Sequence, residues 1–302
     1  MIPADTGPLL RIVSIVFPIF AVIAIGWLYA RYRRTRGGID MAFANELNMD
    51  VFVPALVISA MVSKSFELAS YQWLAAGAAL VILGSGLLAW GLAILLREQA
   101  KTFVPPVMFV NAGNMGLPLM VLAFGEDALP AAVVLFFVEN TLHYTLGTWL
   151  LDHRARLWTL WRNPVIAASM IGIGLSLAKI ELWQPVYLAI KLLGEIAVPL
   201  LLFSLGVRLA VSSLSDWRVG LIGAIASPLL GMALAVPAIQ MFGLSGRDAD
   251  MLLIFGALPP AVLNFVFAER YQQEPAKVAS MVMLGNLGAL VFVPLALVLT
   301  FK

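Results

Sequence analysis

The chain has 302 residues, of which 62% are hydrophobic and only 12% are charged. A soluble domain carries about a quarter charged residues, so this composition predicts a protein that crosses a membrane several times. The absence of cysteine excludes disulfides, thiolate metal sites and cysteine nucleophiles. The net charge of +2 comes from basic residues dispersed over short loops, which argues against a nucleic-acid partner.

Ten apolar segments follow one another along the chain, and each is about 20 residues long, enough to cross roughly 30 Å of hydrocarbon as a helix. They cover residues 9–30, 41–62, 71–96, 103–124, 129–151, 164–180, 185–207, 217–242, 250–268 and 278–300. We therefore predict an all-α membrane protein with ten transmembrane helices.

The basic residues predict the orientation of these helices, because inner loops carry an excess of Lys and Arg. With the N-terminus outside, the inner loops hold 13 of the 19 basic residues. These are Arg31, Arg33, Arg34, Arg36, Arg97, Lys101, Arg154, Arg156, Arg162, Arg208, Arg218, Arg270 and Lys277. We expect a multi-pass protein of the cell's inner (plasma) membrane with both termini outside.

Two of the ten segments contain helix breakers near their middle. Residues 111–118 read NAGNMGLP, and the ring of Pro118 should open the helix because it crowds the carbonyl four residues earlier. Residues 258–264 read LPPAVLN, where Pro259 and Pro260 should do the same. A pair of interrupted spans in corresponding halves points to a transporter binding site, whereas a single proline often only bends a helix.

An internal repeat relates the two halves of the chain. Residues 50–56 and 195–201 both read acidic-x-x-Val-Pro-x-Leu, and their prolines, at 54 and 199, are 145 residues apart. The same offset relates Pro118 to Leu263, which places the two breaks in register. Because each half contains five helices, an odd number, the second half should be inverted in the membrane.

The predicted domains follow from this offset. Residues 1–151 form the first five-helix repeat, residues 152–163 a cytoplasmic linker, and residues 164–302 the second, inverted repeat.

Several strings resemble the auxin efflux carrier family, which includes plant PIN-type carriers and bacterial carriers of malonate, malate and related anions. They are FPIFAVIAIGWL (17–28), VPALVISAMV (53–62), NAGNMGLPL (111–119), RNPVIAASMIGIGL (162–175), VPLLLFSLGVRL (198–209) and ALPPAVLNFVFAERY (257–271). The resemblance implies ten helices in two inverted repeats, a scaffold and a transport domain, and helices 4 and 9 that cross as broken helices. It places substrate beside that crossing and carries this role onto Asn111 and Pro259.

The chain departs from the plant members of that family at two places. Val110 stands where they have a proline, and Gly77 and Val81 in the third helix stand where they have an acidic and a basic residue. These differences argue against an auxin-type mode of substrate binding.

The broken helices themselves predict an anion site. Each half-helix N-terminus carries about half a positive charge and unpaired N–H groups, so two of them directed at one point bind an anion without a cationic side chain. Amides nearby add donors and acceptors, although each could instead bind the opened backbone. The candidate substrate-binding residues are Asn111, Gly113, Asn114, Pro118, Tyr144, Pro259, Pro260 and Asn264.

Three acidic residues within predicted helices are candidates for coupling to a proton or sodium ion, because a charge at a helix centre costs roughly 2.5–3.5 kcal/mol on insertion scales. Asp50 and Glu195 lie one turn before the repeat prolines, although Lys191 could simply pair with Glu195. Glu139 shares a helix face with His143, in a proton relay or in a buried polar network.

We therefore predict a secondary active transporter of small organic anions, chiefly carboxylates, with elevator-type alternating access inferred from the resemblance. The alternatives are a passive anion facilitator or channel of the same fold, and a membrane-embedded sensor. No metalloprotease, nucleophile-elbow or phosphate-loop motif occurs, so we expect no enzymatic activity, no catalytic residue, no metal and no cofactor beyond a coupling ion. The expected partners are the anion, the lipid bilayer and, in one arrangement, a second copy forming a homodimer.

Overall fold

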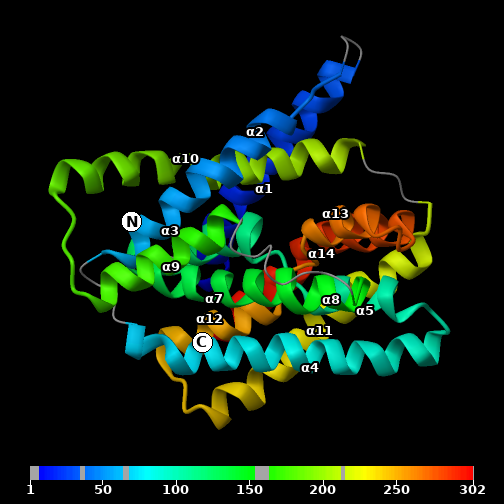
Figure 1. The fold of residues 1–302 in the computed structure, drawn as a ribbon. Helices are drawn as coiled ribbons and strands as arrows, with labels where there is room; N and C mark the ends of the chain where they lie inside the picture. Colours follow the sequence, from blue (N-terminus) through cyan, green and yellow to red (C-terminus); the bar gives the residue numbers. More distant parts are fainter. Residues whose placement is uncertain (1–6, 35–37, 64–67, 154–162, 212–214, 302) are drawn as a thin grey trace.

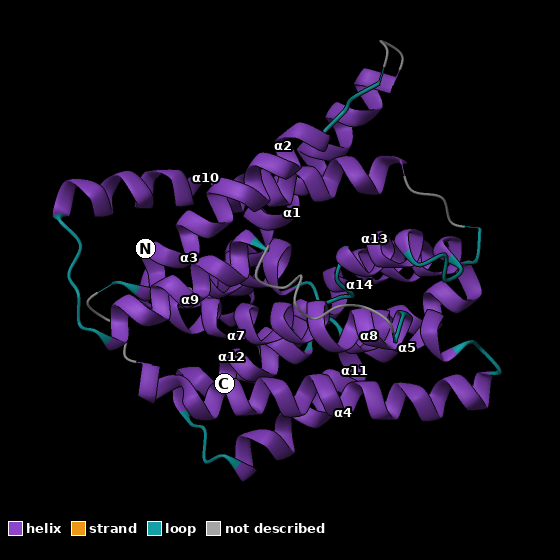
Figure 2. Cartoon of the chain, in the orientation of Figure 1, coloured by secondary structure: helices purple, strands orange, loops and turns teal. Residues whose placement is uncertain are grey.

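The computed structural model describes residues 7–34, 38–63, 68–153, 163–211 and 215–301 (Figure 1). Its described residues form helices joined by short loops, with no β-strand among them (Figure 2). Most of the predicted linker 152–163 lies outside the described residues, as do the basic residues Arg36, Arg154, Arg156 and Arg162.

Among the described residues, six helices are long and apolar enough to cross a membrane. They span Leu10–Arg34, Ala69–Leu96, Glu126–Leu151, Gln184–Ala210, Trp217–Met241 and Pro275–Thr300. Five of these contain one long α-helix each: α1 (Pro8–Arg34), α4 (Gln72–Leu96), α10 (Gln184–Val211), α11 (Trp217–Met241) and α14 (Pro275–Thr300). This confirms an all-helical, multi-pass membrane protein.

The other predicted spans are assembled from shorter pieces. The second contains α2 (Ala42–Leu47), a π-helical turn η1 (Asn48–Phe52) and α3 (Val53–Met61). The fifth follows the 3₁₀ turn η4 (Glu126–Ala128) and contains α7 (Leu129–Leu142), a π turn η5 (His143–Gly147) and α8 (Thr148–Leu151). Another 3₁₀ turn, η2 (Leu68–Tyr71), precedes α4. The sixth is α9 (Pro164–Leu177).

Two spans are interrupted, as the sequence predicts, but one break lies elsewhere. The fourth contains α5 (Ala100–Met108), a π turn η3 (Ala112–Gly116) and α6 (Leu117–Phe124). The chain is open at residues 109–111, so the prediction that Pro118 opens this helix was wrong. Pro118 lies within the half-helix that runs through η3 and α6, from Ala112 to Phe124, just after the π turn.

The second interruption lies where it was predicted. Helix α12 (Gly246–Gly256) ends before Pro259 and Pro260, and α13 (Leu263–Arg270) begins after them. The half-helices that follow the two breaks start at Ala112 and Leu263, 151 residues apart, against the predicted offset of 145.

Glycines allow close contact between the long helices. A side chain at Gly206 of α10 would collide with the backbone carbonyl of Ile23 in α1, and one at Gly231 of α11 with the carbonyl of Gly256 in α12. In Figure 1, α10 and α4 lie on opposite sides of the view, with the interrupted helices between them. The two breaks are therefore held inside the protein, where other residues can satisfy their backbone groups.

Candidate functional site

The two interruptions cross and hydrogen-bond to each other. Val110 and Pro260 form an isolated antiparallel bridge. The Asn111 N–H donates to the Pro259 carbonyl at 2.7 Å, and the Ala261 N–H donates to the Phe109 carbonyl at 2.9 Å. A buried backbone group without a partner is unfavourable, so each opened helix supplies the partners that the other lacks.

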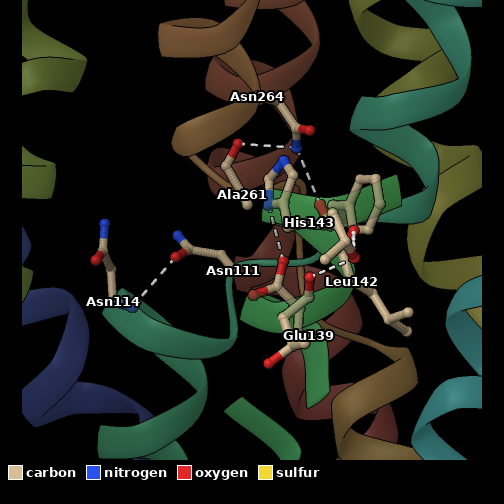
Figure 3. A network of polar contacts seen from close by, with 10 residues as sticks. Asn111, Asn114, Glu139, Leu142, His143, Ala261 and Asn264 are labelled. Carbon is tan, nitrogen blue, oxygen red and sulfur yellow. Dashed lines mark hydrogen bonds and ion pairs between the residues drawn. The ribbon is translucent and has the colours of Figure 1, made fainter. Parts of the chain in front are cut away.

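The side chain of Asn264 stabilises this crossing from α13. Its Nδ2 donates to the carbonyls of Phe109 and Ala261, each at 3.0 Å (Figure 3). The amide nitrogen of Asn264 therefore bonds to the opened backbone, which is the alternative to substrate binding that the sequence analysis left open. Its Oδ1 is buried and has no hydrogen-bond partner among the described residues.

Asn111 stabilises the crossing from the other helix. Its Oδ1 accepts the Asn114 N–H at 3.2 Å (Figure 3), and its Nδ2 donates to Oδ1 of Asn286 on α14 at 2.9 Å. Nδ2 of Asn286 in turn donates to the carbonyls of Pro260 and Val282, at 3.2 and 2.8 Å. Sequence reasoning missed Asn286, although an amide inside an apolar span was a visible signal.

A cavity of about 220 Å³ lies beside the crossing. Both half-helix N-termini contribute to its wall, through Gly113 on one side and Val262 and Leu263 on the other. The first N–H groups of a helix have no acceptor within that helix, and Gly113 and Leu263 belong to the first turns of η3 and α13. Two helix N-termini with unpaired donors at one point form an anion-binding environment.

The structure brings five of the eight predicted substrate-binding residues close to this cavity. Asn111, Gly113, Asn114 and Tyr144 line it, and Asn264 lies behind it at the crossing. The two crossing prolines hold the backbone and do not line the cavity, whereas Pro118 lines a different cavity.

Four buried polar atoms without partners belong to residues that line the first cavity. They are Oδ1 of Asn48, Nδ2 of Asn140, Nε2 of His143 and Oγ of Ser204. Buried polar groups are nearly always hydrogen-bonded, so four such groups around one cavity indicate space for a polar ligand or water. The guanidinium-bearing Arg208 of α10 also lines it. Sequence reasoning did not select Asn48, Ser204 or Arg208 for this site.

Glu139 and His143 form a buried pair in the wall of the same cavity. Oε1 of Glu139 lies 3.0 Å from Nδ1 of His143 (Figure 3), and the two residues are 3% and 1% exposed. The imidazole stacks on the Phe109 ring with a centroid distance of 4.1 Å and meets the edge of Phe267 at 5.2 Å. These rings fix its position beside the crossing.

The other two acidic candidates lie away from this cavity, and both side chains are exposed on the protein surface. Glu195 is 3.8 Å from Lys191, the pairing that the sequence offered as an alternative. Glu195 and Lys191 line a second cavity of about 450 Å³ between α1, α3, α6 and α10. Asp50 lines neither cavity. The described residues contain no cluster of three or more His, Asp or Glu that could hold a metal ion.

Comparisons with known proteins indicate a membrane transport protein. A family model described as "Membrane transport protein" matches residues 11–157 and 153–297. A Rhizobium meliloti protein named "Putative malonate transporter" is 25% identical over 223 residues, 68% of each chain. Auxin efflux carrier component 3a of Oryza sativa is 31% identical over 140 residues, 43% of this chain and 22% of the rice protein. An uncharacterized transporter of Methanocaldococcus jannaschii is 23% identical over 200 residues, 62% of this chain and 64% of the relative.

Proposed function

The chain belongs to the auxin efflux carrier family of membrane transport proteins, and from that premise we propose that it is a secondary active transporter of small organic anions with carboxylate groups. The observation that carries this proposal is the cavity beside the crossing, whose wall includes Gly113, Val262 and Leu263 at the N-terminal ends of two half-helices. Such termini favour negative charge, and the cationic Arg208 of α10, which also lines the cavity, adds to that preference.

The cavity's size supports a small substrate. Its volume of about 220 Å³ is below the roughly 300–1,000 Å³ of pockets that hold drug-sized ligands. The unpaired amide, hydroxyl and imidazole groups of Asn140, Ser204 and His143 supply additional hydrogen-bonding sites for carboxylate oxygens. The relative named as a malonate transporter makes malonate the first probe to use.

We propose alternating access of the elevator type in a ten-helix fold of two inverted repeats. The crossing helices α5–α6 and α12–α13 would move as one body because three side chains and two backbone hydrogen bonds tie them together. They would slide against α3 and α10, which line both cavities, and against α1, which lines the second. A gradient of protons or sodium ions would drive the movement, and both termini would face outside the inner membrane.

Uptake into proteoliposomes tests this function. Vesicles loaded with unlabelled malonate should accumulate labelled malonate by counterflow, because a carrier exchanges bound substrate across the membrane. Purified protein should also be stabilised against heat by malonate, since a ligand that binds only the folded state raises its stability. Equilibration without counterflow would indicate the passive facilitator, and binding without any flux would indicate the sensor.

A further inference from the structure

The Glu139–His143 pair lines the cavity, and its imidazole packs on Phe109 of the crossing. Nδ1 of His143 contacts the carboxylate of Glu139 at 3.0 Å, one helical turn away on the same face (Figure 3). His143 lines the cavity, and its second ring nitrogen, Nε2, is buried and has no partner among the described residues. Because Phe109 and Phe267 pack on the ring, the imidazole is held in this orientation.

This geometry links the number of bound protons to the chemistry of Nε2. When Glu139 is ionised and His143 is neutral, the ring proton must lie on Nδ1, because two acceptors would otherwise face each other at 3.0 Å. Nε2 is then a bare lone pair, which repels a carboxylate. One added proton changes this, whether Glu139 or the imidazole formally carries it. In both cases Nε2 can carry an N–H and donate it to a ligand, and the charge of the pair rises from −1 to zero.

We propose that the coupling ion is a proton, and that the Glu139–His143 pair takes it up when a carboxylate binds through Nε2 of His143. The inference rests on the proposed function and specifies its coupling. The proton moves from solvent to Nε2, the substrate carboxylate accepts that N–H as a hydrogen bond, and no covalent bond to substrate forms. Each substrate molecule then crosses the membrane with one proton, in symport.

Other titratable groups around the cavity set the pH at which this happens. Tyr144 lies on the same helix and Arg208 on α10, and both line the cavity. At the end of α13, Arg270 acts electrostatically on Tyr144, and Glu269 acts on Arg208. The positive charge of Arg208 opposes protonation of the pair, whereas an incoming anion favours it.

Proton counting on the full-length protein in detergent tests this inference, with malonate as the probe. Calorimetric titrations in buffers of different ionisation enthalpy give the number of protons taken up per malonate bound. They are run between about pH 7 and pH 9, where malonate itself is ionised. We expect up to one proton per malonate, with the Kd rising about tenfold for each pH unit above the titration of the pair, as linkage requires.

Two variants separate coupling from a structural role. In Glu139→Gln, the amide satisfies Nδ1 in either tautomer, so Nε2–H forms without proton uptake. This variant should bind malonate independently of pH and, at about pH 9, about tenfold or more tightly than the parent protein. His143→Gln should also lose the proton uptake. His153→Gln, which changes the exposed histidine, should behave like the parent.

The possible outcomes are distinguishable. Malonate binding by the parent without proton uptake overturns the proton-coupling inference and leaves the transport function intact. Proton uptake on malonate binding that persists in both Glu139→Gln and His143→Gln shows that this pair is not the group that binds the proton. If Glu139→Gln does not fold, as judged by gel filtration, the comparison of proton uptake between the parent and His143→Gln still tests the inference. Failure of the parent to bind malonate, succinate or acetate contradicts the proposed function itself.

Discussion

The side chains of Asn111 and Asn286, 175 residues apart in the sequence, hydrogen-bond to each other at 2.9 Å beneath the crossing of the two interrupted helices. Asn286 also donates to the Pro260 carbonyl, so one amide on the continuous helix α14 holds both breaks. Both side chains are buried. Their contact makes the crossing a single unit, in which a change in one interrupted helix affects the other.

Replacing Asn286 by alanine should therefore destabilise the folded protein. The substitution leaves Nδ2 of Asn111 and the Pro260 carbonyl without a partner, and each buried unsatisfied group costs about 1–3 kcal/mol. Asn114→Ala is the matched control, because the structure records a bond for its backbone N–H and none for its side chain. Thermal unfolding in detergent should show a lower midpoint for the first variant alone. Equal unfolding midpoints for Asn286→Ala and Asn114→Ala would show that the side chain of Asn286 does not stabilise the crossing.

Long apolar spans were predictable because their length and composition alone determine that they cross a bilayer. The second break was predictable as well, since Pro259 and Pro260 lack the N–H groups that a helix requires. The first break was misplaced because Phe109 and Val110 carry no local signal. Their extended backbone is held by hydrogen bonds to residues about 150 positions away, which no local pattern reports.

The candidate site was predictable to a similar extent. The sequence identified Asn111 and Tyr144, because a helix break and its polar neighbours can be seen in one segment. It did not identify Asn48 or Ser204, since a single polar residue in an apolar helix does not indicate which cavity it faces. Asp50 was selected for its place in the repeat, and its side chain is exposed. Its coupling role stays a prediction.

Arg208 should contribute to anion binding. Its side chain lines the cavity from α10, and hydrogen bonds that involve charged groups are worth about 1.5–3 kcal/mol. Arg208→Gln should thus weaken malonate binding by roughly 10-fold to 100-fold in calorimetry. Arg218→Gln removes an arginine that lies over the Trp217 ring, away from the cavity, and serves as control. Similar losses in both variants would point to a general charge effect.

Acid should weaken a contact between α14 and the start of α5. Burial alone would raise the pKa of Glu274, but hydrogen bonds from Lys277 and Thr102 outweigh it and hold that pKa below its ordinary value of 4.5. A carboxyl with a lowered pKa in the folded state stabilises the protein above its unfolded pKa and ceases to do so as pH falls through the folded value. The unfolding midpoint of Glu274→Gln should lie below that of the parent at about pH 7, and the difference should shrink below about pH 4. A difference in unfolding midpoint that does not change with pH would show that the substitution acts through packing rather than through the charge of Glu274.

The orientation can be tested with single cysteines, because the chain has none of its own. Ser215 follows α10 and Ser245 precedes α12, and both are exposed. If both termini face outside, Ser245→Cys should react with an impermeant maleimide in intact cells, and Ser215→Cys only after the membrane is opened. The inverse labelling pattern would show that the orientation is reversed. Labelling of both cysteines from the same side would show that no odd number of spans lies between them.

The crossing itself should depend on Pro259. Its carbonyl accepts the Asn111 N–H at 2.7 Å, and its missing N–H leaves no donor to extend α12. Pro259→Ala restores that donor and should allow α12 to lengthen by part of a turn, which would pull the carbonyl away from Asn111 and shift Val262 and Leu263 from the cavity wall. Because these N–H groups belong to the backbone, affinity should fall for every carboxylate tested rather than for one. Calorimetry with malonate, succinate and acetate measures this, and Pro294→Ala, a proline inside α14 that does not line the cavity, provides the control. Parent-like affinity in Pro259→Ala would mean that substrate does not bind at the crossing.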